Sequence, residues 1–157
     1  MMTMLPEIVA GTEDAMDSTR SEIIEFLRRQ ADAMRAKDLD RLMTFYAPDV
    51  VYFDVVPPLR YVGADALRGR FTRWFAGFRG PIDLAIRDLT VAISGDLAVA
   101  HWLSRAGGTL QDGHEAGTWV RGSNCSRRTP GGWSVTHEHI SVPADLRSAT
   151  AAVDLTP

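Results

Sequence analysis

Four strand-like runs fill the second half of the chain and restrict its fold more than any other feature. Each run is rich in β-branched or aromatic residues or alternates between apolar and polar residues. Glycine-rich and proline-containing turns separate them. The runs are Ile82 to Ser94, Leu97 to Ala106, His114 to Arg128 and Trp133 to Val142. Strands joined by such short turns are typical of an antiparallel meander, so we expect a sheet in which consecutive strands are neighbours.

Helical patterns dominate the chain before this sheet. Thr19 and Glu22 form a capping box, and apolar residues at helical spacing then predict a helix over residues 20–36. Asp38 can cap a second, shorter helix, which Pro48 should stop.

A strand and a third helix lie between these helices and the meander. The run Val50 to Val56 predicts a strand that Pro57 ends, and Arg60 to Val62 is a short candidate partner for it. Gly63 opens the third helix, and Gly80 with the following proline terminates it. Its arginines lie largely off its apolar stripe, and we expect them to form a solvated face: Arg68, Arg70, Arg73 and Arg79.

This order of elements predicts an α+β fold in which a curved antiparallel sheet wraps over the N-terminal helices. Such a sheet forms a cone with an open mouth, lined by the inward residues of its strands. We expect one domain over residues 19–143, a loosely held tail over residues 1–18 and a polar tail over residues 144–157.

Composition narrows the function classes. The formal charge of −3 gives no general attraction to nucleic acid or anionic lipid. No stretch approaches the roughly 18 apolar residues that a membrane span needs. Cys125 is the only cysteine, which rules out an intrachain disulfide and a cysteine-based metal site. We therefore expect a cytoplasmic protein without a nucleic-acid or membrane partner.

Two segments resemble a known family. Ala36 to Asp54 reads AKDLDRLMTFYAPDVVYFD and is followed by Gly63 opening a helix, and the chain's last strand-like run reads GGWSVTHEHISVP over Gly131 to Pro143. Both resemble the nuclear-transport-factor-2-like superfamily, and within it the SnoaL-like and ketosteroid-isomerase-like proteins. The resemblance spans Ser21 to Pro143. It implies a cone-shaped, cystatin-like roll and a homodimer formed through the outer face of the sheet. The fold hosts isomerases, dehydratases, cyclases, hydrolases and proteins without activity.

The resemblance carries over to one catalytic position. Asp54 falls where ketosteroid isomerases place their catalytic carboxylate. Gln30 stands where their oxyanion-hole tyrosine is expected, and the region of their second oxyanion acid, near Asn124, has no carboxylic acid. Steroid isomerisation itself is therefore not implied.

The last strand supplies further candidates. Period 2 puts Trp133, Val135, His137 and His139 on one face, which we interpret as a wall of a pocket, and puts Glu138 on the other face.

Three residues are candidates for catalysis. Asp54 ends an apolar strand, and in a closed pocket it could act as a general base, although it could equally accept hydrogen bonds from the turn that follows. His139 is the candidate proton shuttle and Arg121 the candidate stabiliser of negative charge on oxygen, or alternatively a structural partner of Asp54 or Glu138.

Four other residues are candidates for substrate binding, because each shares a strand face with a catalytic candidate or alternates with apolar residues: Tyr52, His101, Trp119 and His137. The spacing of His137 and His139 would also allow two imidazoles to hold one metal ion, and His101 or Glu138 could supply a third ligand. Glu138, however, faces the other side by parity, and no following acid at a useful spacing completes the set. We expect neither a metal nor a cofactor.

The leading hypothesis is an isomerase, cyclase or dehydratase that acts on a hydrophobic carbonyl compound by proton abstraction without a cofactor. A non-catalytic small-molecule-binding or dimerisation domain of the same fold is the alternative. Hydrolysis of an epoxide or ester by an activated water is a third reading. The expected discriminator is whether Asp54, Arg121 and His139 converge on open pocket volume.

Overall fold

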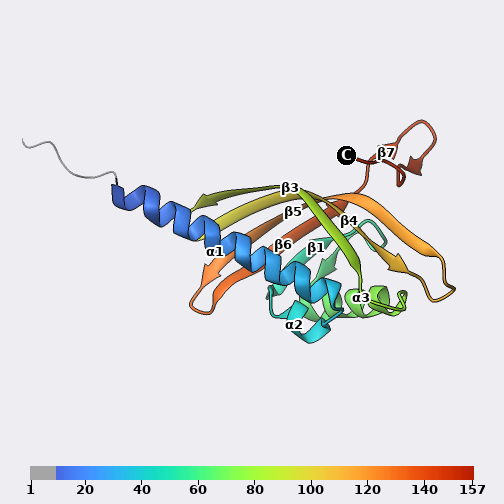
Figure 1. The fold of residues 1–157 in the computed structure, drawn as a ribbon, viewed down its shortest axis with the longest axis horizontal. Coiled ribbons are helices and arrows are strands. Elements are labelled where there is room, and N and C mark those ends of the chain that lie inside the picture. Colours follow the sequence, from blue (N-terminus) through green and yellow to red (C-terminus); the bar gives the residue numbers. More distant parts are fainter. Residues whose placement is uncertain (1–9) are drawn as a thin grey trace, which may run out of the picture.

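The computed structural model describes residues 10–157 and confirms the α+β architecture. A curved, unclosed six-stranded sheet has the order β2-β1-β6-β5-β4-β3, and α1 lies across one face of it (Figure 1). Only the β1–β6 pair is parallel in this sheet. The elements are α1 (Ala10–Arg35), α2 (Leu39–Met43), β1 (Tyr46–Phe53), β2 (Tyr61–Val62), α3 (Ala64–Ala76), β3 (Asp83–Ser94), β4 (Leu97–Thr109), β5 (Glu115–Thr129), β6 (Gly132–Ser141), β7 (Ala144–Asp145) and β8 (Thr150–Ala151).

The meander of four strands is confirmed as β3 to β6. Their bounds agree with the predicted runs within a few residues, because glycine and proline turns separate them in the sequence. Beyond β6 the expected polar tail contains a small hairpin of β7 and β8.

The first helix begins earlier than predicted. Residues 10–18 are helical, not a tail, and the expected tail over residues 1–9 lies outside the described residues. No proline interrupts the chain from Gly11 to Arg35, and acidic residues near a helix start are favoured by the helix dipole. Thr19 therefore lies inside the helix and does not cap it.

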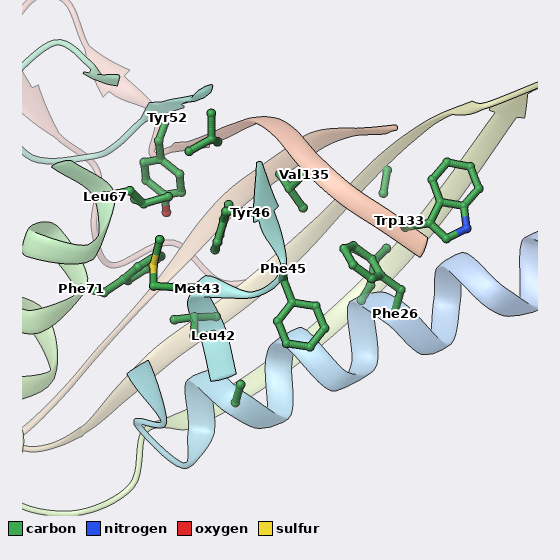
Figure 2. Packing of buried hydrophobic residues seen from close by; sticks show 14 of the residues in the cluster. Phe26, Leu42, Met43, Phe45, Tyr46, Tyr52, Leu67, Phe71, Trp133 and Val135 are labelled. Carbon is green, nitrogen blue, oxygen red and sulfur yellow. The ribbon is translucent and has the colours of Figure 1, made fainter. Parts of the chain in front are cut away.

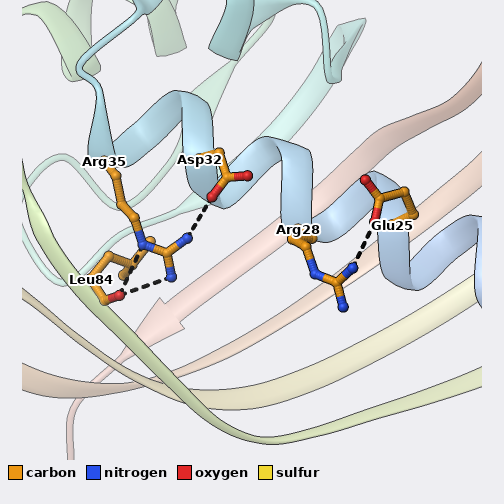
Figure 3. Close-up of polar contacts among 5 residues, drawn as sticks. All are labelled: Glu25, Arg28, Asp32, Arg35 and Leu84. Carbon is orange, nitrogen blue, oxygen red and sulfur yellow. Dashed lines mark hydrogen bonds and ion pairs between the residues drawn. The ribbon is translucent and has the colours of Figure 1, made fainter.

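The end of α1 is fixed to β3. Arg35 donates from Nε to the Leu84 carbonyl at 3.1 Å and from a terminal nitrogen at 2.9 Å (Figure 3). Its other terminal nitrogen pairs with Asp32 at 2.8 Å. About two turns earlier, Arg28 pairs with Glu25 at 2.8 Å, but both side chains are largely exposed, so this pair contributes little stability. The guanidinium of Arg35 thus sets the distance between the helix and the edge strand.

The second helix is capped by Asp38, which accepts from the Arg41 amide at 3.1 Å, as predicted. It is shorter than expected, because β1 already begins at Tyr46. Pro48 lies inside β1 where the register against β6 shifts, and a proline is tolerated at such an irregularity.

The core fills one part of the cone. Aromatic rings from α1, α3 and β1 meet there, and the Phe26 and Phe45 ring centres lie 5.2 Å apart, edge to face (Figure 2). Leu42, Leu67 and Val135 are fully buried beside them. This packed region leaves the remaining space under the sheet open. No helix within residues 10–157 is long and apolar enough to cross a membrane.

Candidate functional site

A cavity of about 490 Å³ lies between α1, α3 and the concave face of the sheet. Its volume is in the range of small-molecule sites. Most of its wall is apolar and comes from all three layers, for example Leu27, Met34, Phe71, Trp74, Trp102 and Ile140. Polar side chains interrupt this wall, and the candidates for chemistry are among them.

A β-bulge in β6 decides which residues of the last strand face the cavity. Ser126 pairs with Val135, whereas the next pair is Cys125 with His137, so Thr136 is an extra residue without a partner in β5. An extra residue reverses the alternation of side chains beyond it. The prediction that Trp133, Val135, His137 and His139 share a face is therefore wrong for the two histidines. Glu138, expected on the opposite face, points into the cone.

Glu138 is the central polar group of the cavity. It is 3% exposed and lines the cavity wall. Its Oε2 accepts from the Tyr46 hydroxyl at 3.3 Å and from Gln30 Nε2 at 3.4 Å. Both distances are near the long end for a hydrogen bond. Both bonds fall on Oε2, so the other oxygen of the carboxyl group accepts no side-chain hydrogen bond within residues 10–157.

Burial gives this carboxyl group an unusual pKa. The pKa of Glu138 is raised to about 7: loss of hydration is the largest cause, the contacts from Gln30, Tyr46 and Asn124 oppose the rise, and the charge of Asp54 adds a smaller contribution to it. The Asn124 amide nitrogen faces no acceptor at hydrogen-bonding geometry, so its effect is only that of a nearby dipole. Near neutral pH, Glu138 exchanges readily between its protonated and ionised forms.

This shift predicts a pH dependence of stability. Below pH 4.5 the carboxyl group is protonated in both the folded and unfolded states; between 4.5 and about 7 the unfolded chain ionises while folded Glu138 keeps its proton. Because the pKa of Glu138 is higher in the folded state than in the unfolded state, the folded state is favoured most at low pH. The free energy of unfolding should therefore fall by about 3 kcal/mol between roughly pH 4 and pH 8. Urea unfolding of the wild type and Glu138→Gln across this range measures it. Parallel stability curves for the two proteins would contradict the prediction.

Asp54 reaches the cavity as predicted, but its two oxygens are already engaged. Oδ1 accepts from the Val55 amide at 2.7 Å, and Oδ2 accepts from Arg70 Nε in a largely buried ion pair. Arg70 comes from α3 and also lies over the Trp74 ring at 5.9 Å. The expectation that Arg70 belongs to a solvated face is wrong, because its position on α3 directs it toward the end of β1.

Tyr52 lies two residues before Asp54 and also lines the cavity, which agrees with its expected position. Burial, followed by the nearby charge of Glu138, raises the pKa of the Tyr52 hydroxyl well above its ordinary value. This hydroxyl therefore stays protonated and can donate a hydrogen bond.

The other predicted residues lie on the convex face of the sheet. Arg121, His139 and His101 line a shallow hollow there, so the expected convergence of Asp54, Arg121 and His139 does not occur. Nδ1 of His137 donates to the Val51 carbonyl at 2.8 Å, and the His137 ring packs against Phe53. Trp119 lies under the Arg87 guanidinium and does not line the cavity.

Besides Asp54 and Tyr52, the cavity contains polar groups that sequence reasoning missed. Glu138 was assigned to the wrong face because a bulge leaves no clear composition signal, and Arg70 was grouped with exposed arginines. Gln30 was noted only through the family resemblance. The signal that could have found Gln30 is its position within the buried stripe of α1, between Leu27 and Ala31.

Within residues 10–157 no group of three or more histidine, cysteine, aspartate or glutamate side chains is placed to hold an ion.

Comparison with known proteins places this chain in a class, the nuclear-transport-factor-2-like proteins. The SnoaL-like domain model matches residues 23–145, and the chain belongs to this SnoaL-like family. A nuclear-transport-factor-2-like protein of unknown function from Pseudomonas putida KT2440 is 34% identical, with a TM-score of 0.81 over 90% of this chain and 98% of that one. No protein of curated function matches the chain.

Two further solved structures share the fold at lower identity. A candidate dehydratase of the same family from Streptomyces avermitilis is 22% identical, with a TM-score of 0.70 over 80% of this chain and 96% of that one. A ketosteroid-isomerase-like protein from Erwinia carotovora atroseptica is 19% identical, with a TM-score of 0.66 over 77% of this chain and 93% of that one. At these identities the likeness concerns the fold alone.

Proposed function

We propose that the cavity binds a hydrophobic small molecule carrying a carbonyl group and catalyses a proton transfer on it without a cofactor, as an isomerase, cyclase or dehydratase does. The observation that carries this proposal is Glu138, a buried carboxyl group whose pKa lies at about 7 in the wall of an apolar cavity. A general base with a pKa near the working pH combines enough ionised form with enough basicity.

The chemistry follows from the free carboxylate oxygen. Ionised Glu138 removes a proton from the carbon next to the ligand's carbonyl group, which leaves an enolate, and the resulting carboxylic acid returns the proton to the same or another carbon. In a dehydratase, the acid would instead protonate a departing hydroxyl group. The names of the two relatives at lower identity, a candidate dehydratase and a ketosteroid-isomerase-like protein, fit this range of reactions.

Asp54 remains the second candidate base. Each of its oxygens already accepts one hydrogen bond, from Val55 or from Arg70, so a ligand would have to share an oxygen with one of these donors. Glu138 instead has one oxygen that accepts no side-chain hydrogen bond within residues 10–157. For this reason we assign the proton transfer to Glu138 and a supporting role to the Asp54–Arg70 pair.

Exchange of carbon-bound hydrogen tests the proposal without knowledge of the natural substrate. We expect the protein to accelerate replacement of the methyl protons of 2-acetylnaphthalene by deuterium in D₂O, followed by NMR. Because the ionised form of Glu138 is the base, the catalysed rate should rise through about pH 7 and then level off.

Two phenylalanine variants control for binding in the cavity. Ala106→Phe, on β4, fills space inside the cavity and should lower the rate by roughly tenfold or more, since it displaces the ligand. Leu146→Phe, at a side chain that is 91% exposed just after β7, should leave the rate unchanged. Binding of the ketone with no accelerated exchange would favour the non-catalytic binding domain over the enzyme.

A homodimer through the convex face is a separate part of the proposal, implied by the family resemblance. Leu97 and Val99 are about half exposed on that face, at 49% and 47%. Light scattering at micromolar protein concentration measures the molar mass in solution. A mass equal to that of one chain would contradict the homodimer.

A further inference from the structure

The wall that β4 contributes to the cavity contains two polar side chains that the proposed reaction does not yet use. Trp102 and Ser104 are two residues apart, so they point to the same side of the sheet, and both line the cavity. Within residues 10–157, neither the indole nitrogen nor the hydroxyl oxygen has a hydrogen-bond partner, and neither is among the side-chain atoms buried without one, which are Asn124 Nδ2, Ser126 Oγ and Trp133 Nε1. Both atoms therefore reach open space, and that space is the cavity.

A glycine on the neighbouring strand holds the indole of Trp102 in place. Trp102 pairs with Gly122 of β5. A side-chain carbon added at Gly122 would lie 2.3 Å from Cε2 and 2.6 Å from Nε1 of that indole. The nitrogen-bearing edge of the ring thus rests directly on the bare backbone of β5. A donor held this way needs no rearrangement when a ligand arrives, which is the requirement for stabilising charge on oxygen.

The register of the sheet places this donor beside Glu138. Trp102, Gly122 and Ile140 form one row across β4, β5 and β6, and Ala100, Asn124 and Glu138 form the next row on the same side. Adjacent rows on one side are separated by two residues, roughly 7 Å along the strand. If the ligand's carbonyl oxygen is bound over Gly122, the carbon next to the carbonyl group can lie toward the row that contains the Glu138 carboxyl group.

We propose that the indole N–H of Trp102, seated on Gly122, and the hydroxyl of Ser104 bind the carbonyl oxygen of the ligand and stabilise its enolate. This rests on the proposed function and deepens it. The ligand is assigned as a flat, conjugated ketone or aldehyde, whose oxygen points to β4 and whose acidic carbon points to β6. The base and the oxygen-binding donors are then supplied by different strands of the same sheet.

A pair of ligands of the same shape isolates the oxygen contact. The probes are 2-acetylnaphthalene and 2-isopropenylnaphthalene. The first has a carbonyl oxygen where the second has a methylene group. Equilibrium dialysis gives the dissociation constant of each for the wild type and the variants. The readout is the ratio of the two constants, because losses of general packing affect both ligands alike. The test variant is Trp102→Phe, which keeps an aromatic ring and removes the N–H.

We expect Trp102→Phe to lower the preference for the ketone by roughly fivefold to tenfold, the effect of one hydrogen bond, and Ser104→Ala to lower it by a smaller factor. Trp119→Phe makes the same change on the convex face and should leave the ratio unchanged. Ser104→Ala decides the matter if Trp102→Phe does not fold, since it removes one oxygen atom and leaves the indole in place.

Three results would overturn the assignment in different ways. An unchanged ratio in Trp102→Phe and Ser104→Ala, with both ligands still bound, removes the donor role and leaves the proposed function standing. A ratio that falls only in Tyr52→Phe or Trp74→Phe assigns the oxygen to another wall of the cavity. If neither ligand binds the wild type, both the donor assignment and the proposed function fail.

Discussion

Glu138→Gln is expected to lower the protein-catalysed deuterium exchange of 2-acetylnaphthalene by a factor of roughly 10² to 10⁴, the usual contribution of a positioned general base. Glutamine has nearly the shape of glutamate and can still accept the hydrogen bond from Tyr46, so the cavity should keep its form. What it loses is the ability to take a proton. The rise of the rate through about pH 7 should disappear together with the rate itself.

Two measurements separate this loss from a general defect. The dissociation constants of the ketone and its hydrocarbon analogue should change by less than about threefold in Glu138→Gln, because the variant keeps the volume of the site. Glu115→Gln, on β5 and exposed to solvent, makes the same chemical change outside the cavity and should retain the full rate. If Glu138→Gln catalyses the exchange at the wild-type rate, another group is the base, and Asp54 would then be the first to examine.

The fold was predictable because its signals are local. The four strands β3 to β6 are separated by glycine and proline turns, and Asp38 and Gly63 mark the starts of α2 and α3 at positions that the structure confirms. The family resemblance, carried by residues 36–54 and 131–143, pointed to the same architecture. The start of α1 was misjudged because residues 10–18 carry no apolar stripe that would reveal a helix. The length of α2 was overestimated because Pro48 lies inside β1 and does not mark the end of the helix.

The candidate site was less predictable because it depends on one inserted residue. Thr136 reverses the facing of the rest of β6, which exchanges His137 and His139 for Glu138 in the cavity wall. A bulge arises from how two strands pair. The alternation of residues within β6 alone does not show how β6 pairs with β5. The same limitation affected Arg70, whose environment depends on how α3 packs against the end of β1.

The Asp54–Arg70 pair should have the largest effect on stability. The Asp54 side chain is 4% exposed and the Arg70 side chain 13% exposed, so neither charge has much water to replace its partner. Asp54→Asn keeps an oxygen for the Val55 amide but leaves the guanidinium unpaired. Breaking one side of a buried ion pair destabilises a protein by about 3 to 5 kcal/mol, and we expect a loss of this size in urea unfolding at pH 7.

A second aspartate–arginine pair, whose arginine is also on α3 and whose aspartate is on α2, provides the control. Arg68 pairs with Asp40 at 2.8 Å, but the Asp40 side chain is 90% exposed, so Asp40→Asn should change the free energy of unfolding by less than about 0.5 kcal/mol. The double variant Asp54→Asn with Arg70→Gln should recover much of the stability, because the unpaired charge is gone. A double variant no more stable than Asp54→Asn would mean that the loss comes from the Val55 turn and not from the charge.

The same variant decides between the two candidate bases. If the pair has a supporting role, Asp54→Asn should retain exchange activity within about tenfold per folded molecule, since the Glu138 oxygen that takes the proton is untouched. A folded Asp54→Asn protein that binds the ketone but has lost exchange by a factor of roughly 10² or more would make Asp54 the base. Glu138 would then act as the acid that returns the proton, because a carboxyl group with a pKa of about 7 can serve in either direction.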